Sequence, residues 1–129
     1  MSEKITSFKD LVAWQKAHEL VLKTYKVLDG FPASEKFALS DQMKRAAVSI
    51  TSNIAEGFSR KTARDKAQFY QTALGSLTEL ESQIMVAFDL HYLDKNICDD
   101  LDLLITETSR LLNGLIKATR ASKFVVPHS

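Results

Sequence analysis

The chain has 129 residues, of which 45% are hydrophobic and 26% charged, and this is enough apolar material for one domain with a core. Seventeen basic and sixteen acidic residues give a net charge of +1, so overall charge neither supports nor excludes nucleic-acid binding. The single Cys98 excludes an internal disulfide, and frequent charges interrupt every apolar run, which argues against insertion into a membrane. We therefore expect a cytoplasmic protein, built from few and long helices because Gly and Pro are scarce.

The first predicted helix spans about residues 8–29. Its apolar positions recur in alternating steps of three and four, the spacing of one buried helix face. They are Leu11, Trp14, His18, Val21, Tyr25 and Leu28. Because His18 falls within this row, we expect a buried histidine with a hydrogen-bond partner rather than a catalytic base. Gly30 and the Phe31-Pro32 pair predict the end of the helix and the following turn.

The second predicted helix spans about residues 34–57. Ser34 is a suitable N-cap, with room for an irregularity near Ser40 and Asp41. Its buried face comprises Met43, Ala47, Ile50 and Ile54. Gly57 predicts the end of this helix.

Two further helices are predicted at about 62–90 and 94–120. Thr62 with Asp65 resembles a capping box, and Asp94 is a suitable N-cap for the last helix. The inner face of the third helix comprises Phe69, Ala73, Leu77, Leu80, Ile84 and Phe88. That of the fourth comprises Ile97, Leu101, Leu104, Leu111 and Leu115. Residues 91–93 form the turn between them, and residues 121–129 are a C-terminal tail.

Short connections between long helices predict antiparallel neighbours. We therefore expect an all-α, up-down-up-down four-helix bundle that occupies residues 1–129 as one domain. A second apolar row lies beside the first on three helices: Ala13, Ala17, Leu20, Val27, Tyr70, Leu74, Ile105, Leu112 and Ile116. This row either widens the core or contributes to an oligomer interface, and the sequence leaves both alternatives open.

No catalytic or metal motif stands out. The Glu-x-x-His pairs of di-iron bundles are missing, and His18, His91 and His128 fall in different parts of the chain. Cys98 has no partner at ligand spacing, the serines lack a nucleophile elbow, and no glycine-rich phosphate loop occurs. The sequence predicts a protein that is not an enzyme and needs no cofactor.

Asn53, Glu56 and Gly57 form the most unusual polar group of the sequence. Asn53 and Glu56 are three residues apart, so they share a helix face. One interpretation is structural, with Gly57 capping the helix and Asn53 bonding to the backbone. The other is a polar patch at one end of the bundle that recognises a partner or a neighbouring subunit.

Basic residues concentrate in the first half of the chain. Residues 1–66 carry twelve Lys and Arg and eight Asp and Glu, whereas residues 67–129 carry five and eight. The candidate nucleic-acid contacts lie around the second helix and the turn after it: Lys44, Arg45, Arg60, Lys61, Arg64 and Lys66. A second set, Lys9, Lys16 and Lys23, recurs every seven residues along the first helix. Repetition in an oligomer would multiply these charges.

Four segments occur in an order that resembles a known bacterial family. They are residues 8–17 (FKDLVAWQKA), the Phe31-Pro32 turn with Glu35, residues 42–57, and residues 75–80 (GSLTEL). Together they resemble the small four-helix-bundle proteins encoded in intervening sequences of 23S ribosomal RNA genes. The likeness covers nearly the whole chain, and it makes Asn53, Glu56, Gly57, Gly75 and Glu79 signature positions with a structural or subunit-contact role.

That family is similar in fold to the accessory variability determinant of diversity-generating retroelements, a homopentamer that binds nucleic acid and a reverse transcriptase. The resemblance implies a homopentamer and an RNA- or DNA-binding role. The alternative function is a protein-interaction or scaffold module without nucleic-acid binding, in which a protein partner docks on the bundle surface or at residues 53–57.

Overall fold

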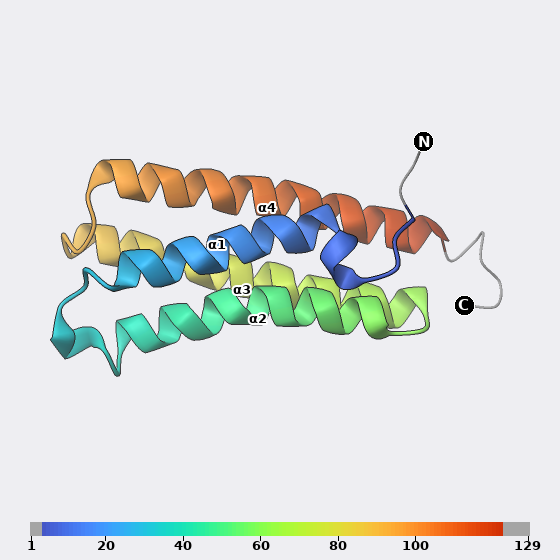
Figure 1. Ribbon diagram of the computed structural model, residues 1–129, viewed down its shortest axis with the longest axis horizontal. Helices are drawn as coiled ribbons and strands as arrows, with labels where there is room; N and C mark the ends of the chain where they lie inside the picture. Colours follow the sequence, from blue (N-terminus) through green and yellow to red (C-terminus); the bar gives the residue numbers. More distant parts are fainter. Residues whose placement is uncertain (1–3, 123–129) are drawn as a thin grey trace.

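The structure is a computed structural model that describes residues 4–122. Within this range it is all-helical and has no strand (Figure 1). The four α-helices are α1 (Val12–Leu28), α2 (Leu39–Ser59), α3 (Ala63–Asp89) and α4 (Lys95–Ser122). Two short 3-10 turns, η1 (Phe8–Asp10) and η2 (Ala33–Glu35), precede α1 and α2. The predicted tail lies outside the described residues beyond Ser122, as does His128.

Contacts between the helices define their directions. Lys16 pairs with Glu107 and Lys23 with Asp100, so residue numbers rise along α1 as they fall along α4. The Ser49 hydroxyl bonds to that of Ser76, while Gly57 lies against Tyr70, so α2 and α3 also run in opposite directions. Each helix thus packs beside two others, as Figure 1 shows.

One apolar cluster contains residues of all four helices. The predicted face of α2 is confirmed, because Met43, Ala47, Ile50 and Ile54 are all fully buried. On α3, four of the predicted residues are buried: Ala73, Leu77, Leu80 and Ile84. The terminal members of that row, Phe69 and Phe88, are half-buried instead.

The rotation of α1 differs from the prediction. The core receives Ala13, Ala17, Leu20, Thr24 and Leu28, whereas Trp14 and Val21 are half-buried and His18 and Tyr25 are exposed. Ala13, Ala17 and Thr24 have small side chains that let neighbouring helices approach closely, and the large aromatic rings of α1 lie beside this row. His18 stacks on Trp14 with ring centroids 4.7 Å apart, so the expectation of a buried histidine is wrong.

The core side of α4 shows the same shift. Its buried row is Cys98, Leu101, Ile105, Thr108, Leu112, Ile116 and Thr119, while Ile97, Leu104, Leu111 and Leu115 are half-buried. The second apolar rows of α1, α3 and α4 therefore belong mainly to the core. Of their nine members only Val27 and Leu74 are half-buried, and the others are buried.

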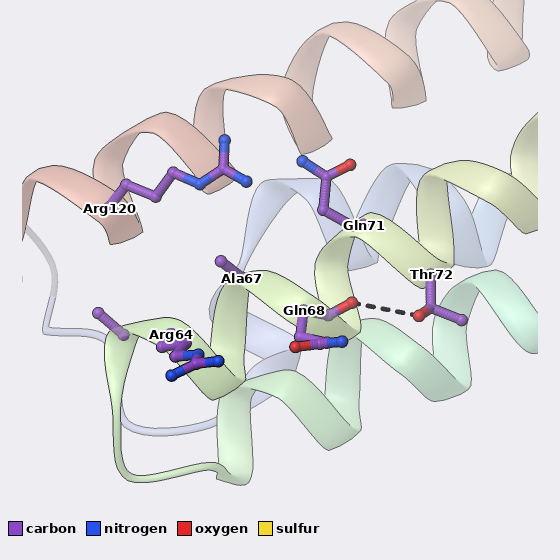
Figure 2. A pocket seen from close by; sticks show the side chains of 7 residues that line it. Arg64, Ala67, Gln68, Gln71, Thr72 and Arg120 are labelled. Atoms are coloured by element: carbon purple, nitrogen blue, oxygen red, sulfur yellow. Dashed lines mark hydrogen bonds between the residues drawn. The ribbon is translucent and has the colours of Figure 1, made fainter.

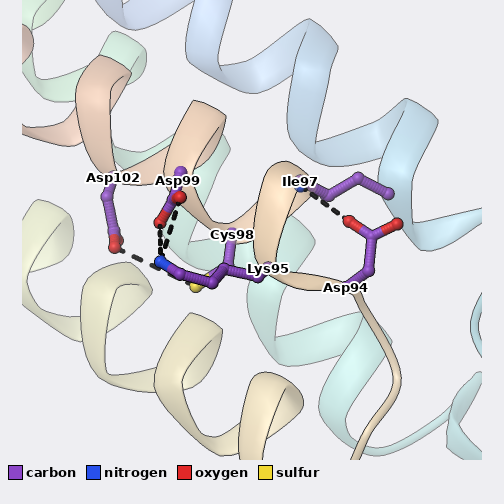
Figure 3. Close-up of polar contacts among 6 residues, drawn as sticks. All are labelled: Asp94, Lys95, Ile97, Cys98, Asp99 and Asp102. Carbon is purple, nitrogen blue, oxygen red and sulfur yellow. Dashed lines mark hydrogen bonds and ion pairs between the residues drawn. The ribbon is translucent and has the colours of Figure 1, made fainter.

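Two of the predicted N-caps are confirmed. Thr62 Oγ1 accepts a hydrogen bond from Asp65 N at 3.1 Å, and Asp94 Oδ1 accepts one from Ile97 N at 2.8 Å (Figure 3). The N-cap predicted at Ser34 is wrong, since Ser34 lies in η2 and α2 begins only at Leu39.

The Glu35 carboxylate explains the later start of α2. One oxygen accepts from Leu39 N at 3.4 Å, and the other accepts from the Tyr92 hydroxyl at 2.7 Å. Glu35 therefore accepts a hydrogen bond from the first residue of α2 and also links the α1–α2 connection to the α3–α4 turn. No helix of residues 4–122 combines the length and hydrophobicity needed to cross a membrane.

Candidate nucleic-acid interface

The six predicted basic contacts do not form one patch. Lys44 and Arg45 lie in the first half of α2, whereas Arg60, Lys61, Arg64 and Lys66 surround the turn between α2 and α3. Arg45 and Arg60 are 15 residues apart along a helix, which corresponds to roughly 22 Å. The charges must therefore be considered as two separate groups.

The Lys44 and Arg45 group is partly neutralised. Arg45 Nε lies 3.0 Å from Asp41 Oδ2, and Lys44 Nζ lies 5.2 Å from the centre of the Tyr25 ring. All four residues line an open pocket of about 520 Å³ on α1 and α2. Because Asp41 lies within this pocket, it weakens the attraction for a phosphate there.

Two of the four residues at the turn stabilise the turn itself. Lys66 Nζ donates to the Phe58 carbonyl at 2.7 Å, so it satisfies one of the acceptors left free at the end of α2. Desolvation by burial lowers the pKa of Lys66 from its ordinary value. Arg60 Nη2 lies 2.8 Å from Glu56 Oε2, and its guanidinium carbon is 4.4 Å from the centre of the Phe69 ring. Both cations already have partners within the chain.

Lys61 and Arg64 are different. Both are exposed, and no carboxylate of residues 4–122 forms an ion pair with either of them. Arg64 lines a pocket of about 540 Å³ together with Arg120, which comes from the last turns of α4 (Figure 2). Two cationic side chains far apart in the sequence therefore share one pocket.

Besides its two arginines, the Arg64–Arg120 pocket is lined by alanines and by uncharged polar residues. Its other lining residues are Ala63, Ala67, Gln68, Gln71 and Thr72. None of the lining residues is acidic. Figure 2 shows Arg120 and Gln71 on one side of Ala67, with Arg64 and Gln68 on the other, while Thr72 Oγ1 donates to the Gln68 carbonyl at 3.1 Å.

Sequence reasoning missed Arg120. It is 56 residues from Arg64 in the chain and falls in the half of the sequence with more acidic than basic residues, although no acidic residue follows Glu107. The usable signal is the opposite direction of α3 and α4, which brings the start of one helix beside the end of the other. Charged residues near the start of α3 and near the end of α4 should therefore lie side by side, and this would have pointed to Arg120.

The signature residue Asn53 is part of a polar junction between α2 and α3. Its side-chain amide donates to the Ser49 carbonyl at 2.8 Å and to Ser49 Oγ at 3.0 Å. The hydroxyl oxygens of Ser49 and Ser76 are 2.8 Å apart. Asn53 therefore bonds to backbone and side chain of its own helix and orients a hydroxyl toward the next one.

Gly57 has a packing role rather than the predicted capping role. The helix continues to Ser59, and none of the glycines has a positive φ, so Gly57 does not end α2. A Cβ atom at this position would lie 2.6 Å from Cε1 of the Tyr70 ring and 3.0 Å from Phe69 Cβ. The close approach of α2 and α3 requires a residue without a side chain.

The two remaining signature positions lie on the outer side of α3. Gly75 is exposed, and a Cβ there would meet nothing within 4 Å. Glu79 is exposed too, and Glu79 Oε2 accepts from Gln83 Nε2 at 3.2 Å. Gln83 Oε1 is buried and has no hydrogen-bond partner within the part of the chain that the structure describes.

A group of titratable side chains also lies at the first turns of α4, away from the basic residues described above (Figure 3). Lys95 pairs with Asp99 at 3.1 Å, and Cys98 Sγ donates to Asp102 Oδ2 at 3.9 Å. Burial raises the pKa of the Cys98 thiol, and the negative charges of Asp102 and Asp99 raise it further, which disfavours the reactive thiolate. Across residues 4–122, no group of three or more His, Cys, Asp or Glu side chains could hold a metal ion.

Comparison with known proteins identifies the family. Among solved structures, the chain is similar to the crystal structure of a protein of unknown function from the S23 ribosomal protein family of Bacteroides thetaiotaomicron. The two are 24% identical with a TM-score of 0.77, over 84% of this chain and 98% of the other, and this likeness supports the helical fold. None of the curated proteins matches the chain. The family model described as 23S rRNA-intervening sequence protein matches residues 9–114, and the chain belongs to this family.

Proposed function

We propose that this protein is a non-enzymatic, cytoplasmic homo-oligomer that binds structured RNA at one end of its helical bundle. The observation that carries the proposal is the Arg64–Arg120 pocket, which is lined by two arginines and by no acidic residue. Lys61, exposed in the turn before α3, adds a third positive charge beside Arg64 in the sequence. Arginine suits phosphate because its planar group can donate two parallel hydrogen bonds.

Each chain contributes only three cations to this site, so the proposed RNA affinity depends on oligomerisation. A protein gains affinity for nucleic acid with each phosphate it neutralises, and three cations in one chain would give only weak binding. A ring of five chains would present the same bundle end five times. The resemblance to the pentameric accessory determinant of retroelements favours this subunit number, with up-down-up-down bundles as the building blocks.

Exposed apolar residues support self-association. Leu22 on α1 and Leu103 on α4 are 58% and 60% exposed. Two ion pairs, Lys16–Glu107 and Lys23–Asp100, join α1 to α4. Leu22 lies between the two lysines along α1, and Leu103 lies between the two acidic residues along α4. We call this surface the α1–α4 face. Val12, also 58% exposed, continues it toward a groove of about 280 Å³ lined mainly by apolar residues such as Leu111 and Leu115.

The proposal is tested by fluorescence anisotropy with a labelled RNA hairpin at a series of salt concentrations. Wild-type protein should bind at low ionic strength and weaken steeply as salt increases. The double variant Lys61→Gln, Arg64→Gln should lose most of this binding and show a shallower salt dependence. The matched control is Lys44→Gln, Arg45→Gln, which removes the same charge from the other basic group and should bind nearly as the wild type does.

Three results would overturn parts of this proposal. Wild-type protein that shows no salt-sensitive binding to RNA at low ionic strength would refute the nucleic-acid function. Equal losses in both double variants would place the contact elsewhere. A protein partner captured equally well by the wild type and both double variants, without RNA binding, would favour the scaffold alternative.

A further inference from the structure

The Arg64–Arg120 pocket differs in shape from a surface that follows a duplex backbone. Its volume of about 540 Å³ falls within the range of about 300–1,000 Å³ typical of sites for small ligands. Duplex RNA is contacted across a wide, shallow groove and along its phosphates, whereas unpaired nucleotides can leave the stack and enter a pocket. A cavity of this size therefore suits a single nucleotide better than an RNA helix.

The lining chemistry matches the three parts of a nucleotide. Arg64 and Arg120 provide guanidinium groups for a phosphate, and either can also stack on a base. Gln68 and Gln71 each have a side-chain amide that can both donate to and accept from a base edge or a ribose hydroxyl. Ala63 and Ala67 leave space between these polar groups, because neither side chain extends beyond Cβ.

We infer that the Arg64–Arg120 pocket binds one unpaired nucleotide of RNA, with its phosphate on one arginine and its base or ribose against the other arginine, Gln68 and Gln71. This inference rests on the proposed function and makes it more specific. A hairpin loop, a bulge or a strand end would supply such a nucleotide, and a fully paired stem would not. A free nucleoside monophosphate carries the same chemistry, so the experiment must separate the two sources.

The experiment compares two labelled RNAs that share one stem, a hairpin with a single-stranded loop and the corresponding blunt duplex. Wild-type protein should bind the hairpin about tenfold more tightly, since one charge-assisted contact to the unpaired nucleotide has roughly that value. Arg120→Gln should abolish the preference for the hairpin while retaining the weaker duplex binding. Arg120→Lys should restore only part of it, because lysine keeps the charge but not the planar group.

Lys117→Gln is the matched control, because it removes the same charge from an exposed position about one turn earlier on α4 and outside the pocket lining. It should retain the hairpin preference. Arg120 is exposed near the end of α4, so its replacement should not disturb folding, and circular dichroism of each variant checks this. A hairpin preference that survives in Arg120→Gln, or is absent from the wild type, would overturn the inference while leaving the proposed RNA binding intact.

Uridine and adenosine monophosphates serve as competitors and as NMR ligands. Competition by millimolar nucleotide, together with shifts confined to the amides of Arg64, Gln68, Gln71 and Arg120, would support the pocket as the nucleotide site. If neither RNA binds but a monophosphate gives these shifts, the proposed RNA function fails and the pocket is a site for free nucleotides. If inorganic phosphate alone reproduces every shift, the base and ribose are not recognised and the inference is wrong.

Discussion

Gly57 of α2 lies so close to the buried ring of Tyr70 on α3 that a Cβ atom at position 57 would be 2.6 Å from Tyr70 Cε1. Tyr70 is only 2% exposed, so its ring is part of the packed core. Phe69 Cβ, 3.0 Å from the same point, blocks the other side. A glycine within a helix normally costs stability, and here the close packing of α2 against α3 compensates for that cost.

We therefore expect Gly57→Ala to destabilise the protein by up to about 2 kcal/mol, because inserting a methyl group into a packed core usually costs about 1–3 kcal/mol. Alanine favours the helix by about 1 kcal/mol over glycine, which offsets part of this cost. Urea denaturation followed by circular dichroism measures the difference. Gly75→Ala is the control, because a Cβ there meets nothing within 4 Å and the variant should be more stable than the wild type. An equal gain at position 57 would contradict the packing argument.

Tyr70 also predicts a response to alkaline pH. Desolvation by burial raises the pKa of its hydroxyl from the ordinary value of 10.0 to about 12. Above pH 10 the unfolded chain releases this proton while the folded chain still holds it, so the free energy of unfolding should decrease as pH rises from about 10 to 12. Urea midpoints measured at pH 8, 10 and 11 should decrease less in Tyr70→Phe than in the wild type. Parallel curves would show that Tyr70 ionises equally in both states.

The sequence was sufficient to predict four helices and two of their starts. Thr62 and Asp94 are oxygen-bearing side chains that directly precede long amphipathic segments, and their capping bonds are local. Local rules failed at Ser34, because Glu35 makes its bonds to Leu39 and to Tyr92, and the latter is 57 residues away. A hydrogen bond between segments so far apart cannot be predicted from the local pattern of a short stretch of sequence.

Helix rotation was predicted less well, for a related physical reason. Periodicity ranks large apolar side chains as the core, and on α1 it selected Trp14 and Tyr25. The true core side of α1 contains Ala17 and Thr24, whose small volume allows close helix packing. The buried Thr24 hydroxyl has a hydrogen-bond partner, because Oγ1 donates to the Leu20 carbonyl at 2.7 Å.

The same limit applies to the candidate site. Lys61 and Arg64 could be found from charge, but only the packing of α3 against α4 brings Arg120 to the pocket.

The turn between α3 and α4 contains a strained residue. His91 has a φ of +64°, a left-handed conformation that glycine adopts readily and other residues rarely adopt. We expect His91→Gly to raise stability by up to about 1 kcal/mol, since the left-handed conformation costs an L-residue about 1–2 kcal/mol and glycine's greater unfolded entropy offsets part of this. His91→Ala is the control and should bring no gain. A lower thermal midpoint in His91→Gly would mean that the imidazole contributes more than the strain costs.

The α1–α4 face provides the test of assembly. Glutamate at both positions, Leu22→Glu with Leu103→Glu, would bury two unpaired charges in any interface formed there, and such charges are strongly unfavourable. We expect the wild type to have the mass of an oligomer in multi-angle light scattering, near 72 kDa for five chains of 14.5 kDa, and the double variant to have that of a monomer. Both leucines are more than half exposed within the single chain, so the variant should keep its helical circular dichroism spectrum.

Met85→Glu is the control for that experiment, because Met85 is also exposed, at 49%, but belongs to α3 and not to the α1–α4 face. It should assemble as the wild type does. If Met85→Glu dissociates the oligomer and the double leucine variant does not, the interface lies on α3. A monomeric wild type would remove the fivefold repetition of Lys61, Arg64 and Arg120. RNA affinity would then depend on a single Arg64–Arg120 pocket, and its salt dependence should correspond to about three phosphate contacts.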